Sequence, residues 1–247
     1  MSHHIVELKN LEFAYPDGTP ALRGVSFRIV HGESVGLVGA NGAGKSTLLL
    51  HLNGCLFPAG GTVQVGDFPL TRKNVDDVRR RVGMVFQDPD DQLFMPRVFD
   101  DVAFGPLNLG LPPGEVEARV HGALREVGAV HLAERPPYRI SGGEKRAAAI
   151  ATVLSMSPDI LVMDEPSSGL DPLSRRQLIG LLRNFRHTKI IATHDLDLVL
   201  DVCERTIILS GGCVAADGPT LEIFRDEALL TANHLERPLR MQPLLDG

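Results

Sequence analysis

The chain has 247 residues and a net charge of −6, with 43% apolar and 23% charged residues. This is the balance of a globular protein with a buried core, and no apolar run reaches the ~18 residues needed to span a bilayer. Scattered basic residues disfavour nucleic-acid binding. The N-terminus lacks the basic and apolar regions of a signal peptide, so we expect a cytosolic protein. His3 and His4 are expected to form a frayed, solvated terminus rather than a metal site.

The cysteines indicate neither a disulfide framework nor a metal site. Cys55, Cys203 and Cys213 are odd in number and have no CxxC spacing. They are expected to be free, reduced and mostly buried thiols.

The first part of the chain predicts antiparallel β-structure. Apolar residues alternate with a period of two in 11–15 and 25–29, and a turn follows at 16–18. Val63 and Val65 add a short strand after two glycines. We place these β pieces at about 5–31 and 61–70.

A β-then-α pattern follows. Continuous apolar runs at 34–38, 160–163 and 190–192 are typical of strands buried on both faces of a parallel sheet. Helical patterns at 45–53, 173–186 and 195–204 come after them. Such alternation indicates an α/β sheet with helices on both faces.

The region from about 98 to 158 is expected to be mainly helical. Pro112 and Pro113 open a helix that Gly128 ends, with apolar residues on one face. This region is expected to sit as a helical lobe on the sheet.

Residues 39–46 match the phosphate-binding pattern G-x-x-x-x-G-K-[ST], with a strand before them and a helix after them. Glycines let backbone N–H groups crowd around phosphate oxygens, and a helix N-terminus favours an anion. Lys45 would reach the β- and γ-phosphates, and the Ser46 hydroxyl could bind Mg²⁺. The loop consists of Gly39, Ala40, Asn41, Gly42, Ala43, Gly44, Lys45 and Ser46.

Two carboxylates end the predicted strand 160–163. Successive strand residues point to opposite sides, so Asp164 and Glu165 can have different tasks. Asp164 would hold Mg²⁺, and Glu165 would act as general base on the attacking water.

Five further features make the sequence resemble the ATP-binding-cassette (ABC) ATPases. Residues 140–146, ISGGEKR, resemble the family's signature loop, and 168–171, SGLD, resemble its D-loop. Gln87 falls at the Q-loop position, His194 at the switch histidine, and Tyr15 at the residue that stacks on adenine. The motifs run in family order and cover nearly the whole chain.

This resemblance implies an α/β P-loop NTPase (RecA-like) core with an antiparallel β subdomain and a helical subdomain. One ABC ATPase domain is expected over 5–238, with the helical subdomain at about 98–158 and a tail at 239–247 whose role stays open. It also implies ATP and Mg²⁺ as cofactors, with Ser46, Gln87 and Asp164 at the metal. Catalytic roles fall on Lys45, Gln87, Glu165 and His194. The implied nucleotide contacts are Tyr15, Gly39, Ala40, Asn41, Gly42, Ala43, Gly44, Lys45, Ser46, Thr47, Ser141, Gly142, Gly143 and Asp171.

By the same resemblance, two copies pair head to tail, and each ATP lies between the phosphate loop of one and the signature loop of the other. The fifth signature residue is usually glutamine, whereas here it is Glu144. Ser141-x-x-Glu144 also fits a helix capping box. We therefore expect Glu144 to point back to the cap and away from the nucleotide.

Residues 86–94, FQDPDDQLF, are similar to the stretch after the Q-loop in energy-coupling-factor ATPases. The run 149–154 looks closest to the cobalt and nickel members. The expected partners are therefore a second copy and transmembrane energy-coupling and substrate-capture subunits, at the cytoplasmic face of the membrane. A vitamin importer is the alternative, and an ABC ATPase of DNA maintenance is disfavoured because no coiled-coil heptads separate the phosphate loop from the signature.

Overall fold

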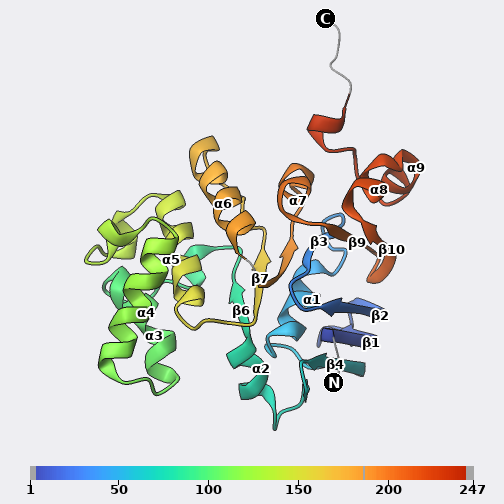
Figure 1. Cartoon of the computed structure of the whole chain (residues 1–247). Helices are drawn as coiled ribbons and strands as arrows, with labels where there is room; N and C mark the ends of the chain where they lie inside the picture. Colours follow the sequence, from blue (N-terminus) through green and yellow to red (C-terminus); the bar gives the residue numbers. More distant parts are fainter. Residues whose placement is uncertain (1–3, 186, 243–247) are drawn as a thin grey trace, which may run out of the picture.

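A computed structural model describes residues 4–185 and 187–242, and Figure 1 shows the arrangement of its elements. His3 and the last five positions of the expected tail lie outside the described residues. The strands are β1 (His4–Ala14), β2 (Pro20–Val30), β3 (Ser34–Val38), β4 (Gly60–Val65), β5 (Phe68–Pro69), β6 (Val82–Val85), β7 (Ile160–Asp164), β8 (Thr188–Ala192), β9 (Arg205–Ser210) and β10 (Cys213–Pro219).

Helices connect and cover these strands. The α-helices are α1 (Lys45–Leu52), α2 (Val75–Arg81), α3 (Val98–Asn108), α4 (Pro113–Glu126), α5 (Gly142–Leu154), α6 (Pro172–Asn184), α7 (Leu196–Val202), α8 (Thr220–Arg225) and α9 (Glu227–Ala232). Short 3₁₀ helices are η1 (Pro89–Asp91), η2 (Val130–Leu132), η3 (Pro137–Arg139) and η4 (Leu239–Met241).

The central sheet has the order β10-β9-β3-β8-β7-β6. Its strands are parallel except for β10, which pairs antiparallel with β9. Every residue of β3, β7 and β8 is buried, which explains why the sequence shows continuous apolar runs there rather than alternation. The carboxyl ends of these adjacent strands carry the loops that form the candidate site.

The second sheet, β2-β1-β4-β5, is antiparallel throughout. Helix α1 lies between the two sheets, at the centre of Figure 1, and contacts β2 and β4 on one side and β7 and β8 on the other. Its Leu48, Leu49 and Leu52 are fully buried in the core that joins the sheets. This packing fixes the start of α1, and with it the phosphate loop, against the central sheet.

Helices α3, α4 and α5 form a separate group beside β6, seen at the left of Figure 1. Their own apolar core includes Val102, Val120, Leu124 and Ala148. On α4, Val116, Val120 and Leu124 are buried as the spacing predicted, and the backbone turns at Gly128 with φ 69°. The signature helix α5 belongs to this group.

The fold class predicted from the sequence is confirmed: an α/β P-loop core carries an antiparallel sheet and a helical group. Two expectations were wrong in part. Cys55 and Cys213 are exposed, and only Cys203 is buried. No strand was predicted over 205–219, where β9 and β10 complete the sheet. Within the described residues, no helix is both long and apolar enough to cross a membrane.

Candidate nucleotide-binding site

The phosphate loop connects β3 to α1 and lines a cavity of about 710 Å³. β3 is held between β8 and β9, so the loop starts from the middle of the sheet. Gly39 has φ 154°, and a Cβ there would collide with the carbonyl oxygen of Leu209 on β9. Glycine is therefore required for the loop to leave the sheet at this point.

Lys45 is the first residue of α1 and is buried. Its Nζ donates to the carbonyl oxygens of Gly39 at 2.7 Å and Ala40 at 3.2 Å. The ammonium group is thus held inside the curve of the loop, beside the first unpaired N–H groups of α1. Positive charge and helix terminus together form a site for phosphate oxygens.

Tyr15, which follows β1, lines the same cavity. Its hydroxyl lies 2.9 Å from Oγ1 of Thr47, and Phe13 packs edge-on against its ring with centroids 5.3 Å apart. The aromatic ring is therefore held at the mouth of the phosphate loop, where one face can stack on a planar base.

Asp164 ends β7 and is buried. Burial raises the pKa of this carboxyl, and a hydrogen bond with Ser46 partly opposes that shift. Among the described residues, its Oδ1 has no hydrogen-bond partner. A buried carboxylate oxygen without a partner, beside a serine hydroxyl, fits an oxygen-ligand site for Mg²⁺.

The same residues do not form a self-contained metal cage. No cluster of three His, Cys, Asp or Glu side chains that could hold a metal occurs within 4–185 and 187–242. The donor set suits a cation that keeps water ligands and shares substrate phosphates.

Glu165 lies outside the strand, because β7 ends at Asp164 and Glu165 has a left-handed φ of 45°. The alternation along a strand expected for these two acids therefore does not apply. The left-handed backbone costs about 1 kcal/mol, and it is held by the bond from the Glu165 N–H to the carbonyl of Ala192 at 2.8 Å. This turn directs the carboxylate toward the end of β8.

At the end of β8, three groups surround the Glu165 carboxylate. Its Oε2 accepts from the Thr193 hydroxyl at 2.9 Å and from the His194 N–H at 3.2 Å. It also lies 2.8 Å from Nδ1 of His194. Both side chains line the cavity of the phosphate loop. A carboxylate paired with an imidazole in this way can orient water and accept its proton.

Gln87 follows β6 and also lines the cavity. Arg146 of α5 holds this segment by donating to the carbonyl oxygens of Phe86 at 2.8 Å and Gln87 at 2.6 Å. Arg146 is buried, and burial lowers the pKa of its guanidinium. A buried arginine of the helical group thus fixes the backbone of a residue in the cavity, which the sequence analysis missed.

The signature residues begin α5 and do not line this cavity. Ser141 is the N-cap of α5, and the predicted capping box with Glu144 is present. Oε2 of Glu144 accepts from the Ser141 N–H and from the Ser141 hydroxyl, each at 2.8 Å. Glu144 therefore points back to the cap, as expected.

Gly142 follows Ser141 in the first turn of α5, and Gly143 packs against the start of α6. A Cβ at Gly143 would collide with Oγ of Ser174. Asp171 caps α6, accepting at Oδ1 from the N–H groups of Leu173 and Ser174 at 2.9 and 3.1 Å. The signature loop and the Asp171 loop are therefore in contact within one chain.

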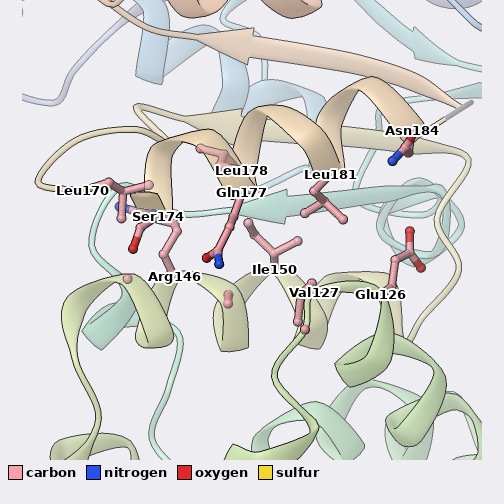
Figure 2. A pocket seen from close by; sticks show the side chains of 13 residues that line it. Glu126, Val127, Arg146, Ile150, Leu170, Ser174, Gln177, Leu178, Leu181 and Asn184 are labelled. Atoms are coloured by element: carbon pink, nitrogen blue, oxygen red, sulfur yellow. The ribbon is translucent and has the colours of Figure 1, made fainter. Parts of the chain in front are cut away.

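Figure 2 shows the cleft of about 380 Å³ between α5 and α6, with Ser174 and Arg146 near its end. Apolar side chains such as Ile150, Leu178 and Leu181 face one another across it. At one end of this cleft the starts of α5 and α6 meet at Gly143 and Ser174.

Several known proteins are similar to this chain in sequence. Residues 22–168 match the family model described as ABC transporter. A candidate ABC transporter ATP-binding protein of Geobacter sulfurreducens is 70% identical over 98% of this chain and 97% of its own length. The energy-coupling factor transporter ATP-binding protein EcfA of Methanothermobacter thermautotrophicus is 46% identical over 95% of this chain and 77% of its own length.

Solved structures agree in fold. cbiO1 of Clostridium perfringens, part of the ABC transporter complex cbiONQ, has a TM-score of 0.82 at 38% identity, covering 94% of each chain. A dimeric ATP-binding cassette in a post-hydrolysis state with ADP and Pi has a TM-score of 0.78 at 27% identity, covering 87% of this chain and 98% of its own. The matched family model, which spans the phosphate loop and both carboxylates, and these relatives show that the chain belongs to the ABC transporter family, as one of its ATPase cassettes.

Proposed function

We propose that the chain is the ATP-binding subunit of an energy-coupling-factor importer and works as a homodimer. The homodimer is inferred from one observation. Phosphate loop, Glu165 and His194 line one cavity, whereas Ser141 and the glycines after it lie outside that cavity in the same chain. A head-to-tail second copy supplies them. The dimeric cassette with ADP and Pi is a precedent for such pairing.

In this proposal ATP lies along the cavity from Tyr15 to His194. Tyr15 stacks on the adenine, and Lys45 with the backbone N–H groups of the loop binds the phosphates. Ser46, Asp164 and Gln87 hold Mg²⁺, which neutralises charge on the phosphates when bound. Thr47 supports Tyr15 through the contact of their hydroxyl groups.

The reaction is attack of water on the γ-phosphate, giving ADP and inorganic phosphate. Glu165 accepts a proton from the attacking water, and His194 orients the water and contacts the γ-phosphate. The bonds from Thr193 and His194 to the Glu165 carboxylate fix its direction before substrate binds. The oxygen–phosphorus bond to ADP breaks as the new bond to water forms.

The partner in the membrane docks on a groove of about 510 Å³ between α2, β6, α3 and α5. Phe94 and Phe104 line it, are exposed, and pack edge-on with centroids 5.1 Å apart. Two exposed aromatic rings in this groove suit the apolar face of a helix from a transmembrane subunit. Phe86 lines this groove and the next residue, Gln87, lines the ATP cavity, so one segment connects the two sites. The chain then works at the cytoplasmic face of the membrane.

The cargo we propose is cobalt or nickel ions, because the run 149–154 looks closest to the cobalt and nickel members of the energy-coupling-factor group. A vitamin is the alternative, because the EcfA relative is named for the coupling factor rather than for a solute. The ATPase does not bind the solute in either case. A role in DNA maintenance stays disfavoured by the net charge of −6.

The test is uptake of radiolabelled cobalt, nickel and vitamins by cells with and without the gene. Loss of cobalt or nickel uptake that wild-type chain restores and Lys45→Ala does not restore would support the proposal. Loss of vitamin uptake alone would refute the metal assignment. Unchanged uptake of every solute would refute the importer role.

A further inference from the structure

We infer that the C-terminal segment, residues 233–241, is part of the ATP site. Within it, His234 donates a hydrogen bond to the phosphate chain of ATP. The cavity that the phosphate loop, Gln87, Glu165 and His194 line is also lined by His234 and Leu235. No sequence motif contains these two residues. They reach the cavity from the end of α9, after both sheets are complete. This inference rests on the proposed ATP site.

His234 is held in place by the geometry of the helix end. α9 ends at Ala232, and His234 has a left-handed φ of 58°. The N–H groups of His234 and Leu235 donate to the carbonyls of Thr231 at 3.1 Å and Leu230 at 2.9 Å, which closes the helix. Positive φ is unfavourable for histidine, and here it coincides with a side chain that lines the ATP cavity.

The residues on either side of His234 are held in place. Asn233 is buried and its Nδ2 donates to the carbonyl of Leu229 at 2.8 Å. Leu235 packs against the apolar cluster between the central sheet and the helices α6 and α7. Since both neighbours are fixed, the exposed imidazole is presented from a rigid backbone rather than from a loose tail.

A second anchor follows six residues later. Arg240 donates from Nε to Oδ1 of Asp197 at 3.1 Å and from a terminal nitrogen to Oδ1 of Asp201 at 3.1 Å. The N–H of Leu239 also donates to Oδ2 of Asp197 at 3.1 Å. Asp197 lies in the first turn of α7, three residues after His194.

This anchor indicates which end of ATP the segment meets. Arg240 ties the segment to α7, the helix that follows His194, and His194 lines the cavity. On the basis of this anchor we place His234 at the γ-phosphate end of ATP rather than at the adenine end. The ligand groups available there are phosphate oxygens, which accept hydrogen bonds. A neutral or protonated imidazole has an N–H to donate to them. His234 is therefore a phosphate contact, and Arg240 is a positioning residue.

The experiment is a titration of the full chain with a fluorescent ATP analogue, which requires no hydrolysis. His234→Gly removes the imidazole and also relieves the positive φ, so weaker binding cannot come from backbone strain. It is expected to raise the Kd about tenfold, the loss of one hydrogen bond to a charged group. His234→Gln, which keeps an N–H donor, should recover most of that factor. His121→Ala, which changes a partly exposed histidine of α4 far along the chain, is the control and should bind as wild type.

Arg240→Ala tests the positioning role. It is expected to raise the Kd by less than tenfold. In the His234→Gly background it should not raise the Kd further, because the ring that Arg240 positions is gone. Wild-type binding by His234→Gly, or fully additive effects of the two changes, would overturn the inference while leaving the ATP site intact. If the wild-type chain bound no nucleotide, the proposed ATP site itself would be refuted, and this inference with it.

Discussion

Glu165 shows how two strand ends create a reactive pair. Its carboxylate is reached by the hydroxyl of Thr193 and the backbone of His194, and the left-handed turn at Glu165 brings these groups together. Asp164, one residue earlier, remains in the strand and is directed toward Ser46. The different tasks of the two acids thus come from a backbone turn after Asp164, not from alternation along one strand.

Replacing the predicted base tests this assignment directly. Glu165→Gln keeps the shape and the acceptor for Thr193 but cannot take a proton from water. We expect hydrolysis to fall by about 10²–10⁴-fold, with ATP binding retained and a stable ATP-bound dimer. Steady-state phosphate release and size-exclusion chromatography with ATP measure the two effects. Normal hydrolysis by Glu165→Gln would show that another group is the base.

Glu144 tests whether a carboxylate in the signature loop is structural. The Ser141 N–H and hydroxyl lower the pKa of Glu144, so its charge contributes stability above its ordinary pKa of 4.5 and loses it as the pH falls through the lower folded value. Glu144→Gln keeps the capping box, whereas Glu144→Ala breaks it. We expect the Ala variant to lose about 0.5–1 kcal/mol of stability. The Gln variant should lose less, because it keeps the capping box and because partial exposure of the site weakens the effect of the charge.

Urea unfolding of the two variants at neutral and at acidic pH measures these differences. The gap between wild type and Glu144→Gln should close at acidic pH, where the carboxyl of the native chain is protonated. Hydrolysis by Glu144→Gln should stay within about threefold of wild type, since less than 1 kcal/mol separates such rates. A much larger change in rate would place Glu144 at the nucleotide rather than at the cap.

At the scale of elements, sequence patterns predicted the strands that are buried on both faces. β3, β7 and β8 read as uninterrupted apolar runs because helices or the second sheet cover each face. β9 and β10 were missed, although 207–209 is apolar, because β10 is half exposed and its pairing depends on a turn at Gly211 and Gly212. A local sequence pattern does not indicate which edge of a sheet is joined by a hairpin near the end of the chain.

Arg146 links two elements that are far apart in the chain. Its guanidinium holds the carbonyls of Phe86 and Gln87 from helix α5, a contact between residues about 60 positions apart. Arg146→Met keeps a long apolar stem but leaves both carbonyls without this donor. We expect a loss of about 1–3 kcal/mol of stability and a fall in kcat with little change in ATP affinity. Arg146→Lys can donate to one of the two carbonyls, so its stability and kcat should lie between those of the wild type and Arg146→Met. Equal kcat in all three chains would contradict a link between Arg146 and the cavity.

Gly143 and Ser174 form the contact between the starts of α5 and α6. Gly143→Ala should push the two helices apart, because the new Cβ would meet Oγ and Cβ of Ser174. We expect ATP-dependent dimerisation to weaken at least tenfold, while ATP binding by the single chain is kept. Ser174→Gly removes both clashing atoms and should restore dimerisation in the double variant. Failure of that rescue, in dimerisation measured by analytical ultracentrifugation, would show that Gly143 is needed for another reason, such as contact with ATP.

At the scale of the whole molecule, site residues that belong to sequence motifs could be predicted. Residues that the fold brings to the site from outside any motif could not. Lys45, Asp164, Glu165, His194 and Gln87 were named from the sequence, and the structure places them around one cavity or its wall. His234 had no motif, since its place depends on the anchoring of α9 and η4 on the core. The separation of Ser141 from the cavity also follows only from the arrangement of the helical group.

That separation gives the sharpest test of the dimer. If sites form between copies, a mixture of Lys45→Ala and Ser141→Arg chains contains dimers in which an intact phosphate loop faces an intact signature loop. Random pairing of equal amounts then restores about a quarter of the wild-type sites, although each variant alone is inactive. If each chain used its own signature loop, every site in the mixture would carry a defect. Phosphate release from the mixture, compared with each variant alone, therefore decides between a shared and a self-contained site: no gain on mixing would refute the head-to-tail dimer.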